Sequence, residues 1–345
     1  MSDTVRIGIV GAGGFTRRRM LPNLLAVEGA EVVAVANRSL ESAERVAAEF
    51  GIPAPMGDWR ELVARDDIDA VFVGTQPYFH HEAVMAALDA GKHVLCQTRM
   101  ATSLAQAREM LAKAEETGLK ARLAPPTSYE HARRYVKHLL DDGYVGAVRQ
   151  VFAYYLVSDY ADGSGPLQRR QDHRMFGAVN PLHLGLDWDV LRLWFGDPDR
   201  VLAWGRTFTP QRADGPGGGF IAVEMPDALT VVAEIPGGAT VTCIQSGVTL
   251  FGEERVEIYG DEGTLVYPRK GELSGARRGE EGLAPLPVPS GLEETWHAEE
   301  DFVRLVRGED VGEHDTFRDG VKNMEFLEAS ALSLTRSGWV DLPLP

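Results

Sequence analysis

Several features that define other protein classes are scarce in this sequence. Cysteine occurs only twice, at Cys96 and Cys243, in 345 residues. Two cysteines provide no disulfide framework and favour a reducing compartment. No uncharged apolar run is long enough to cross a bilayer, and the chain does not open with a basic segment followed by an apolar core. We therefore expect a cytoplasmic protein without a membrane partner.

Positive charge and repetition are also lacking. The chain carries 35 lysines and arginines against 51 aspartates and glutamates, a formal net charge of −16. Proteins that bind nucleic acid gather basic residues over one face, so a nucleic-acid partner is not expected. No internal repeat is visible, and the chain is too long for one typical core, which predicts two domains.

The most informative stretch lies near the start of the chain. The apolar run Ile7–Val10 meets Gly11, Gly13 and Gly14, and a segment with helical spacing begins near Phe15. A strand, a glycine turn and a helix in this order are typical of dinucleotide binding. Gly11 permits the tight turn, Gly13 lets the backbone approach a pyrophosphate, and the helix N-terminus attracts its charge. The turn alone is weak evidence, and it gains weight from the strands and helices after it.

The third position of this glycine motif holds Thr16, where glycine or alanine is usual. A larger side chain there predicts slightly looser packing of the helix on the strand.

Short apolar strands then alternate with helices. The predicted strands are Glu31–Ala36, Asp69–Gly74, His93–Cys96 and Lys120–Leu123, and the predicted helices are Ser39–Phe50, Phe79–Ala90 and Ser103–Thr117. This alternation predicts a parallel sheet with helices on both faces. The first domain is therefore expected to be a doubly wound α/β dinucleotide-binding domain of residues 1–124, ending at the double proline beyond it.

The second half has a different pattern. A helix is predicted from Tyr129 to Asp141 and a strand from Val148 to Val157, followed by several strands joined by tight turns and a closing helix from Phe317 to Arg336. This predicts an α/β domain of residues 125–345 with a large, mainly antiparallel open sheet. The glycine-rich stretches 214–219 and 271–291 are expected to be mobile loops.

The end of the second strand bears on the choice of cofactor. An acidic side chain there binds the adenosine ribose of NAD, but this chain has Asn37, Arg38 and Ser39. The Arg38 guanidinium and the Ser39 hydroxyl suit a 2′-phosphate, which favours NADP over NAD. The alternative is that Arg38 stacks on adenine or faces water.

At this point the sequence resembles a known family. The order of GAGGFTRRRMLPNL, VVAVANRS and FVGTQPYFHHEAVMAALDAGKHVLC is similar to the Gfo/Idh/MocA family of glucose–fructose oxidoreductases and inositol dehydrogenases, as are the later FGEERVEIYGDEGTLV and GWVDLP. The resemblance covers nearly the whole chain. It implies a Rossmann domain joined to an open-sheet α/β domain, a nicotinamide cofactor, a sugar-like small-molecule substrate, and a homodimer or homotetramer.

The resemblance also assigns residues to the cofactor. Thr75, Gln76 and His80 match the loop after the strand Asp69–Gly74, which in this family lies along the cofactor, and Gln97 follows the next strand.

Two departures from the family pattern concern catalysis. Where the family usually has Glu-Lys-Pro, this chain has Gln97, Thr98 and Arg99. The lysine polarises the reacting oxygen, and a threonine hydroxyl offers a hydrogen bond without its charge. The family's Asp-x-Gly-x-His motif is best matched by the segment from His183 to Asp187, with acid and imidazole exchanged. The resemblance thus implies His183 as base or acid, assisted by Asp187 and Thr98.

The surroundings of this segment add candidates. Asn180 and Pro181 predict a helix start, which places His183 and Asp187 one turn apart on one helix face. The same pattern fits a buried pair that only fastens the helix. The polar stretch before it suggests substrate contacts, and the candidates are Arg99, His173, Arg174 and Asn180. His173, His183 and Asp187 do not form a dense ligand motif, so no metal is predicted.

Three functions remain open on the sequence. The first is an NADP-linked oxidoreductase acting on a sugar-like or small polyol or carbonyl substrate. The second is an enzyme that uses bound cofactor transiently for elimination or hydrolysis, and the third is a cofactor-binding sensor without catalysis. Fold resemblance does not choose among them, because function belongs to the site.

Overall fold

The computed structural model describes residues 4–126, 131–177, 182–214, 218–293, 296–312 and 314–345. The chain divides into two compact units, one formed by residues 1–125 and 297–321 and the other by residues 126–296 and 322–345. The predicted second domain was continuous from residue 125, whereas residues 297–321 join the first unit. There Asn23 donates a hydrogen bond to Glu299 of helix α9 (Ala298–Val306), and the N–H of Leu123 donates to the carbonyl of Asp315.

The described part of the first unit contains a parallel sheet of six strands. Their order is β3 (Ala54–Met56), β2 (Ala30–Ala36), β1 (Val5–Val10), β4 (Ala70–Val73), β5 (His93–Gln97) and β6 (Ala121–Ala124). This is the doubly wound order, and it confirms the predicted fold class. The direction of strand order reverses between β1 and β4, which is the place where doubly wound sheets generally bind ligands, beyond the carboxyl ends of the strands.

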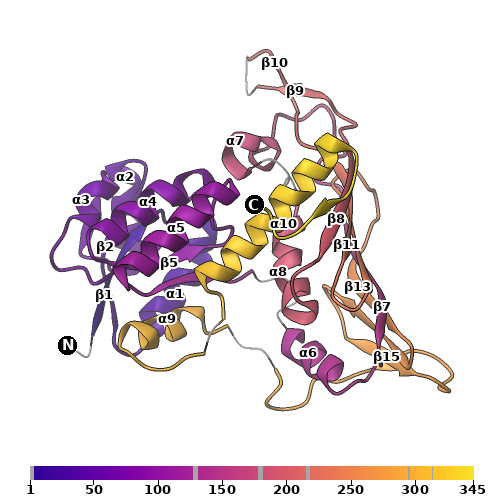
Figure 1. Cartoon of the computed structure of the whole chain (residues 1–345). Helices are drawn as coiled ribbons and strands as arrows, with labels where there is room; N and C mark the ends of the chain where they lie inside the picture. The colour runs from indigo at the N-terminus through magenta and orange to yellow at the C-terminus, as the bar shows by residue number, and fades with distance from the viewer. Residues whose placement is uncertain (1–3, 127–130, 178–181, 215–217, 294–295, 313) are drawn as a thin grey trace. The chain divides into compact units, whose positions relative to one another are not determined.

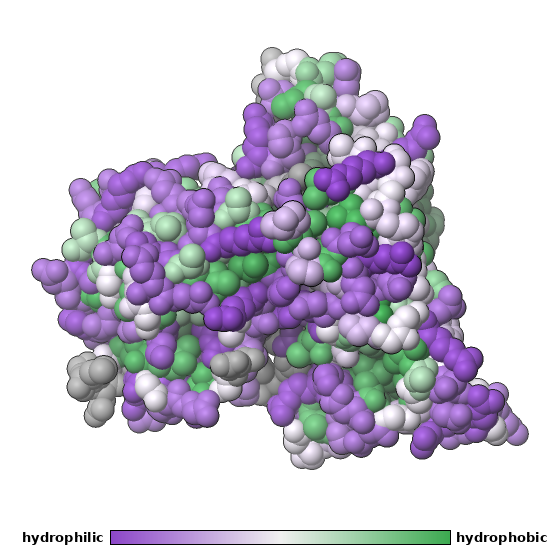
Figure 2. All heavy atoms as spheres, viewed as in Figure 1, coloured by the Kyte–Doolittle hydropathy of each residue, from purple (hydrophilic) through white to green (hydrophobic). Residues whose placement is uncertain are grey.

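The helices of this unit that precede α9 pack on both faces of that sheet, which fits its mainly apolar strands. They are the π-helical turn η1 (Thr16–Met20), α1 (Leu21–Ala26), α2 (Leu40–Phe50), α3 (Trp59–Val63), α4 (Pro77–Asp89) and α5 (Leu104–Thr117). In α2, Ala43, Val46 and Ala47 are buried, while its charged side chains face outward. Hydrophilic side chains accordingly cover much of the surface drawn over these helices in Figure 2. The short β3 and α3 were not predicted.

The second unit is organised around a larger sheet. Among the described residues its strand order is β16 (Ala284–Pro285), β15 (Ser274–Arg277), β14 (Gly263–Pro268), β13 (Glu254–Gly260), β7 (Val148–Leu156), β12 (Thr240–Ser246), β11 (Ala228–Glu234), β8 (Arg200–Arg206) and β17 (Val340–Asp341). Only the pair β7 and β12 is parallel among the pairings described, which confirms a mainly antiparallel sheet. A separate hairpin joins β9 (Gln211–Ala213) to β10 (Phe220–Ala222).

Helices cover one face of this sheet (Figure 1). They are α6 (Arg133–Asp141), α8 (Leu184–Phe195) and the part of α10 (Phe317–Arg336) that comes after Val321. Two short helical turns, η2 (Arg169–Gln171) and α7 (His173–Phe176), precede α8. The closing helix has the predicted bounds.

Two predictions for this unit were wrong. Helix α8 begins at Leu184 with His183 as its N-cap residue, three residues later than the start predicted at Asn180 and Pro181, which lie outside the described residues. The stretch 271–291 is not a simple loop, because it contributes β15 and β16 to the sheet edge. The glycines made this stretch look like a loop in the sequence. At Gly275, however, the strand requires glycine, because a Cβ there would lie within 3 Å of the Leu286 and Leu265 side chains.

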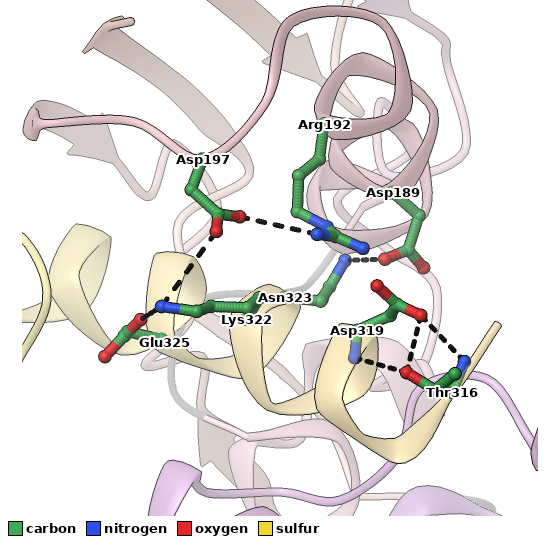
Figure 3. Close-up of polar contacts among 8 residues, drawn as sticks. All are labelled: Asp189, Arg192, Asp197, Thr316, Asp319, Lys322, Asn323 and Glu325. Carbon is green, nitrogen blue, oxygen red and sulfur yellow. Dashed lines mark hydrogen bonds and ion pairs between the residues drawn. The ribbon is translucent and has the colours of Figure 1, made fainter. Parts of the chain in front are cut away.

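Helix α8 is tied firmly to α10. The amide of Asn323 donates a hydrogen bond of 2.6 Å to the carbonyl of Gly185 and another to the carboxylate of Asp189. Figure 3 shows the second contact beside the ion pairs that link Asp197 to Arg192 and Lys322. Trp188 also stacks on Phe326, with ring centroids 3.9 Å apart. These contacts with α10 therefore fix the position of the start of α8.

Replacing Asn323 tests this anchor. Asn323 is 4% exposed, so Asn323→Ala takes one buried donor from Gly185 and one from Asp189. We expect the free energy of unfolding to fall by about 2 kcal/mol, measured by urea denaturation with tryptophan fluorescence. The control is Thr335→Ala, because that exposed hydroxyl bonds only within its own helix. Equal stability of the two variants would contradict the anchor.

Candidate functional site

The glycine turn after β1 is shaped by its contact with the loop after β4. Gly11 has φ +88°, and a Cβ there would lie 2.5 Å from Cγ2 of Thr75 and 3.0 Å from its backbone nitrogen. The N–H of Gly11 donates to the carbonyl of Ala36, so the turn is also paired with the end of β2. Both the backbone conformation and the crowding require glycine at this position.

Gly13 has a different explanation. Its φ lies outside the left-handed range, and a Cβ built on it would meet no protein atom within 4 Å. Neither backbone conformation nor protein packing therefore demands a glycine. The position is open to solvent beyond the carboxyl ends of β1 and β4, where a ligand can approach the backbone closely. This is the fit expected for a pyrophosphate.

Thr16 packs more closely than predicted. It is fully buried, and its hydroxyl donates a hydrogen bond of 3.2 Å to the carbonyl of Gly11. A Cβ on Gly74 would lie 2.5 Å from that hydroxyl oxygen. The prediction of looser packing was wrong, because a glycine on the neighbouring strand end makes room for the threonine.

The helical segment after the turn places an arginine beside it. The N–H of Arg17 donates to the carbonyl of Gly13, so helical bonding starts directly at the turn, with Phe15 half-buried in its first residues. The guanidinium of Arg18 folds back over Gly14, 2.9 Å from where a Cβ would stand. Arg17 instead pairs with Glu49. Arg18 was not predicted as a site residue, although three successive arginines after a glycine turn were a visible signal.

The residues at the end of β2 divide into two kinds. Asn37 accepts a hydrogen bond of 2.8 Å from the N–H of Ala12 and donates to Ser42, so its amide joins the turn to α2. Ser39 is the N-cap residue of α2, and its hydroxyl accepts a hydrogen bond from the N–H of Ser42. Arg38 is exposed and has no ion-pair partner among the residues that the structure describes.

His80 fastens the loops after β4 and β5. It is fully buried, with Nδ1 2.8 Å from the carbonyl oxygen of Arg99 and Nε2 3.1 Å from that of Thr75. Burial lowers the pKa of His80, and the two carbonyl oxygens oppose that shift. Gln76 caps α4 at the same loop. The two segments predicted to line a cofactor are thereby held together.

The segment of Gln97, Thr98 and Arg99 lies at the carboxyl end of β5. Gln97 and Thr98 are half-buried, and the N–H of Thr98 donates to the carbonyl of Ala124. The Arg99 side chain is only 4% exposed. A buried guanidinium is poorly placed to reach out to a substrate, and the substrate role of Arg99 stays a prediction.

In the second unit, His183 belongs to a polar cluster between α8 and the sheet. Its ring stacks on Tyr155 of β7, with centroids 4.2 Å apart and planes 16° apart. Nη1 of Arg269, just after β14, lies 3.3 Å from Nδ1 of His183. The guanidinium carbon of Arg269 is also 5.7 Å from the Tyr155 ring centroid. The imidazole is thus held on one side by an aromatic face and on one edge by a cation.

Asp187 and Gln245 complete this cluster. Gln245 of β12 accepts from the backbone N–H of His183 at 3.1 Å and donates to Asp187 at 3.0 Å. Asp187 is 3% exposed and lies 3.7 Å from Arg269, which also pairs with Glu254 at 3.0 Å. The sequence-predicted pair is therefore brought together, but through Gln245 and Arg269. Neither was foreseen, since Gln245 and Arg269 lie 62 and 86 positions beyond His183 in the chain.

The remaining substrate candidates lie on the segment before α8. His173 pairs with Glu224 at 2.7 Å, and Arg174 grips Asp172 through two nitrogens at 2.8 and 2.7 Å. That arginine holds the pKa of Asp172 below its usual value. His173 and Arg174 are both exposed. Asn180 lies outside the described residues.

Two kinds of feature are absent from the described residues. No cluster of three or more histidine, cysteine, aspartate or glutamate side chains there is arranged to hold a metal ion. None of the helices found there combines the length and apolarity that a membrane crossing needs.

Family models match both units. The model of an oxidoreductase family with an NAD-binding Rossmann fold, Gfo/Idh/MocA, matches residues 5–124, and that family's C-terminal domain model matches residues 133–266. The chain belongs to the Gfo/Idh/MocA family. The resemblance inferred from the sequence is confirmed.

Several curated proteins are similar in sequence to this chain. A dTDP-3,4-didehydro-2,6-dideoxy-α-D-glucose 3-reductase of Saccharopolyspora spinosa is 36% identical over 47% of this chain and 48% of its own length. A trans-1,2-dihydrobenzene-1,2-diol dehydrogenase of Bos taurus is 30% identical over 68% of this chain and 64% of its own. The chain thus spans about half the length of the first of these relatives and under two thirds of the second.

Several solved structures share this fold over nearly the whole chain. An oxidoreductase domain protein from Kribbella flavida superposes with a TM-score of 0.82 at 25% identity, covering 99% of this chain and 100% of that one. Levoglucosan dehydrogenase in complex with NADH and L-sorbose superposes with a TM-score of 0.84 at 22% identity, over 99% of each chain.

Two glycines of the family's cofactor domain give opposite predictions. Gly13→Ala adds a methyl group in open space, so we expect unchanged stability and at least about tenfold weaker binding of NADH, a loss of about 1.4 kcal/mol. Gly74→Ala puts a Cβ 2.6 Å from the Gly11 carbonyl and should cost about 1–3 kcal/mol of stability. Calorimetry and thermal unfolding measure the two effects. Unimpaired binding by Gly13→Ala would show that no phosphate approaches this turn.

Proposed function

We propose that this protein is an NAD(P)-dependent oxidoreductase that transfers a hydride between the nicotinamide ring and a sugar-like or other small polyol or carbonyl substrate. The observation that carries the proposal is Gly13, a glycine that the protein's own packing does not require, at the point where strand order reverses. Membership in an NAD-binding oxidoreductase family supports it.

The first unit supplies the residues that would hold the cofactor. The backbone of the turn at Gly11, Gly13 and Gly14 and the helix behind it would receive the pyrophosphate, with Arg18 as an added cation. The loops carrying Thr75, Gln76, Gln97 and Thr98, which His80 fastens, would lie along the nicotinamide side. A bound nicotinamide accepts or donates the hydride.

The second unit supplies the polar cluster for the substrate. A hydroxyl or carbonyl oxygen needs a partner that exchanges or shares a proton, and His183 is suited to that role. Asp187 acts through Gln245 and Arg269, which hold the start of α8 and the imidazole. Thr98 would add a hydrogen bond without charge. The contacts predicted for His173, Arg174 and Asn180 belong to the same proposal.

NADP is the proposed preference over NAD. Arg38 is exposed, and no carboxylate stands at the end of β2 to repel a 2′-phosphate. Levoglucosan dehydrogenase, which has a similar fold, has been solved in complex with NADH. NAD(H) is therefore the cofactor to test beside NADP(H). We retain the expectations of a cytoplasmic location and a homodimer or homotetramer.

Arg38 gives the test of the cofactor. We expect calorimetry to find tighter binding of NADPH than of NADH, and Arg38→Gln to weaken NADPH alone by about tenfold to a hundredfold, the value of a charge-assisted bond of about 1.5–3 kcal/mol. Arg45→Gln is the control, because Arg45 is an exposed arginine of α2 that pairs with Glu41. Tighter binding of NADH would reverse the preference, and binding of neither dinucleotide would end the proposal.

The threonine in place of the family lysine favours a second candidate, in which no net redox change occurs. Thr98→Lys separates the two. If the site is a dehydrogenase without an ammonium group, the variant should raise the rate of NAD(P)H formation with a polyol library, because a cation stabilises developing negative charge on oxygen. Turnover by wild type without NAD(P)H formation, abolished by lysine, would favour the redox-neutral enzyme. Tight cofactor binding with no turnover by either protein would favour a sensor.

A further inference from the structure

We propose that Arg269 is a positioning residue that fixes the tautomer of His183, so that the imidazole carries its proton on Nε2 and serves as a hydrogen-bond donor to the substrate oxygen. The tautomer is set by contacts within the second unit. Its use toward a substrate rests on the function proposed above.

Arg269 is itself held in place by the sheet. Its backbone N–H donates to the carbonyl of Glu254 at 2.9 Å, which extends the pairing of β13 and β14 by one residue. Its side chain is 20% exposed and reaches the Glu254 carboxylate at 3.0 Å and the Asp187 carboxylate at 3.7 Å. Two carboxylates and the Tyr155 ring therefore aim the guanidinium at one place.

That place is Nδ1 of His183. Nη1 of Arg269 lies 3.3 Å from Nδ1, and a guanidinium only donates hydrogen bonds and stays protonated. Nδ1 must therefore present its lone pair. A neutral imidazole has one proton, so that proton sits on Nε2.

The other charges around the ring are consistent with this state. From β7, Tyr155 stacks on the imidazole, and burial raises the pKa of its phenol, so it stays uncharged. From α8 and β13, the Asp187 and Glu254 carboxylates both pair with Arg269. Both carboxylates thus contact the same guanidinium that contacts Nδ1.

The consequence concerns the missing lysine. In this tautomer His183 offers an N–H from Nε2 rather than a lone pair, which is the requirement for polarising a carbonyl oxygen. A donor of this kind would stand in for the ammonium that Thr98 does not provide. The base role, which needs the Nε2 lone pair, is the one this arrangement disfavours.

Nitrogen NMR of the full chain tests the tautomer without any substrate. The nine histidines are labelled with ¹⁵N, and two-bond ¹H–¹⁵N spectra are recorded at neutral pH, with His183→Gln identifying the signals of His183. We expect Nδ1 at the position of a non-protonated nitrogen and Nε2 at that of a protonated one. A protonated Nδ1 in the wild-type protein would overturn the proposal before any variant of Arg269 is made.

Variants then assign the effect to Arg269. Arg269→Gln should shift the Nδ1 signal toward the protonated position, and Arg269→Lys, which retains a cationic donor, should restore it. Arg255→Gln is the matched control, since Arg255 also pairs with a glutamate and lies over a tyrosine, Tyr154, on the opposite side of β7. An unchanged spectrum in folded Arg269→Gln would show that the arginine does not set the tautomer.

The outcomes are independent of the proposed function. If calorimetry finds no dinucleotide binding, the function fails while the tautomer of His183 is still measured. If the cofactor binds and Nδ1 is protonated, only the role of Arg269 is lost.

Discussion

The first unit depends on how closely β1 and β4 approach at their carboxyl ends. Gly11 and Gly74 leave no room for a Cβ, and the buried hydroxyl of Thr16 fills the space between them. This contact constrains the path of the turn that leads to Gly13, where a Cβ would meet no protein atom within 4 Å. A larger side chain at Gly11 or Gly74 would therefore change the turn, whereas one at Gly13 would not disturb the packing.

In the second unit, polar contacts position the start of α8. His183 lies at the start of α8. This start is fixed by hydrogen bonds to Asn323 of α10 and to Gln245 of β12. Arg269 then connects the imidazole with two carboxylates. A buried aspartate is costly unless it is paired and hydrogen-bonded, and here its partners are the groups that orient the histidine. The contacts that stabilise the buried Asp187 carboxylate therefore also orient the His183 imidazole.

These contacts bear on the chemistry proposed for α8. Gln245 and Arg269 each contact both His183 and Asp187 at the start of that helix. The histidine faces an arginine, whereas a carboxylate beside Nδ1 would put the proton on that nitrogen. In the proposed function, the Nε2–H of this tautomer would polarise a substrate oxygen.

The sequence alone determined the doubly wound sheet, the mainly antiparallel second sheet, the closing helix from Phe317 to Arg336 and the family, because these depend on local periodicity and on motifs of adjacent residues. It also predicted the strands that end before Gly13 and Arg38. Only the tertiary structure decided that residues 297–321 join the first unit, that Gly74 makes room for Thr16, and that Arg269 and Gln245 meet His183. Such contacts join residues far apart in the chain, and no local pattern encodes which distant strand will stand opposite a given side chain.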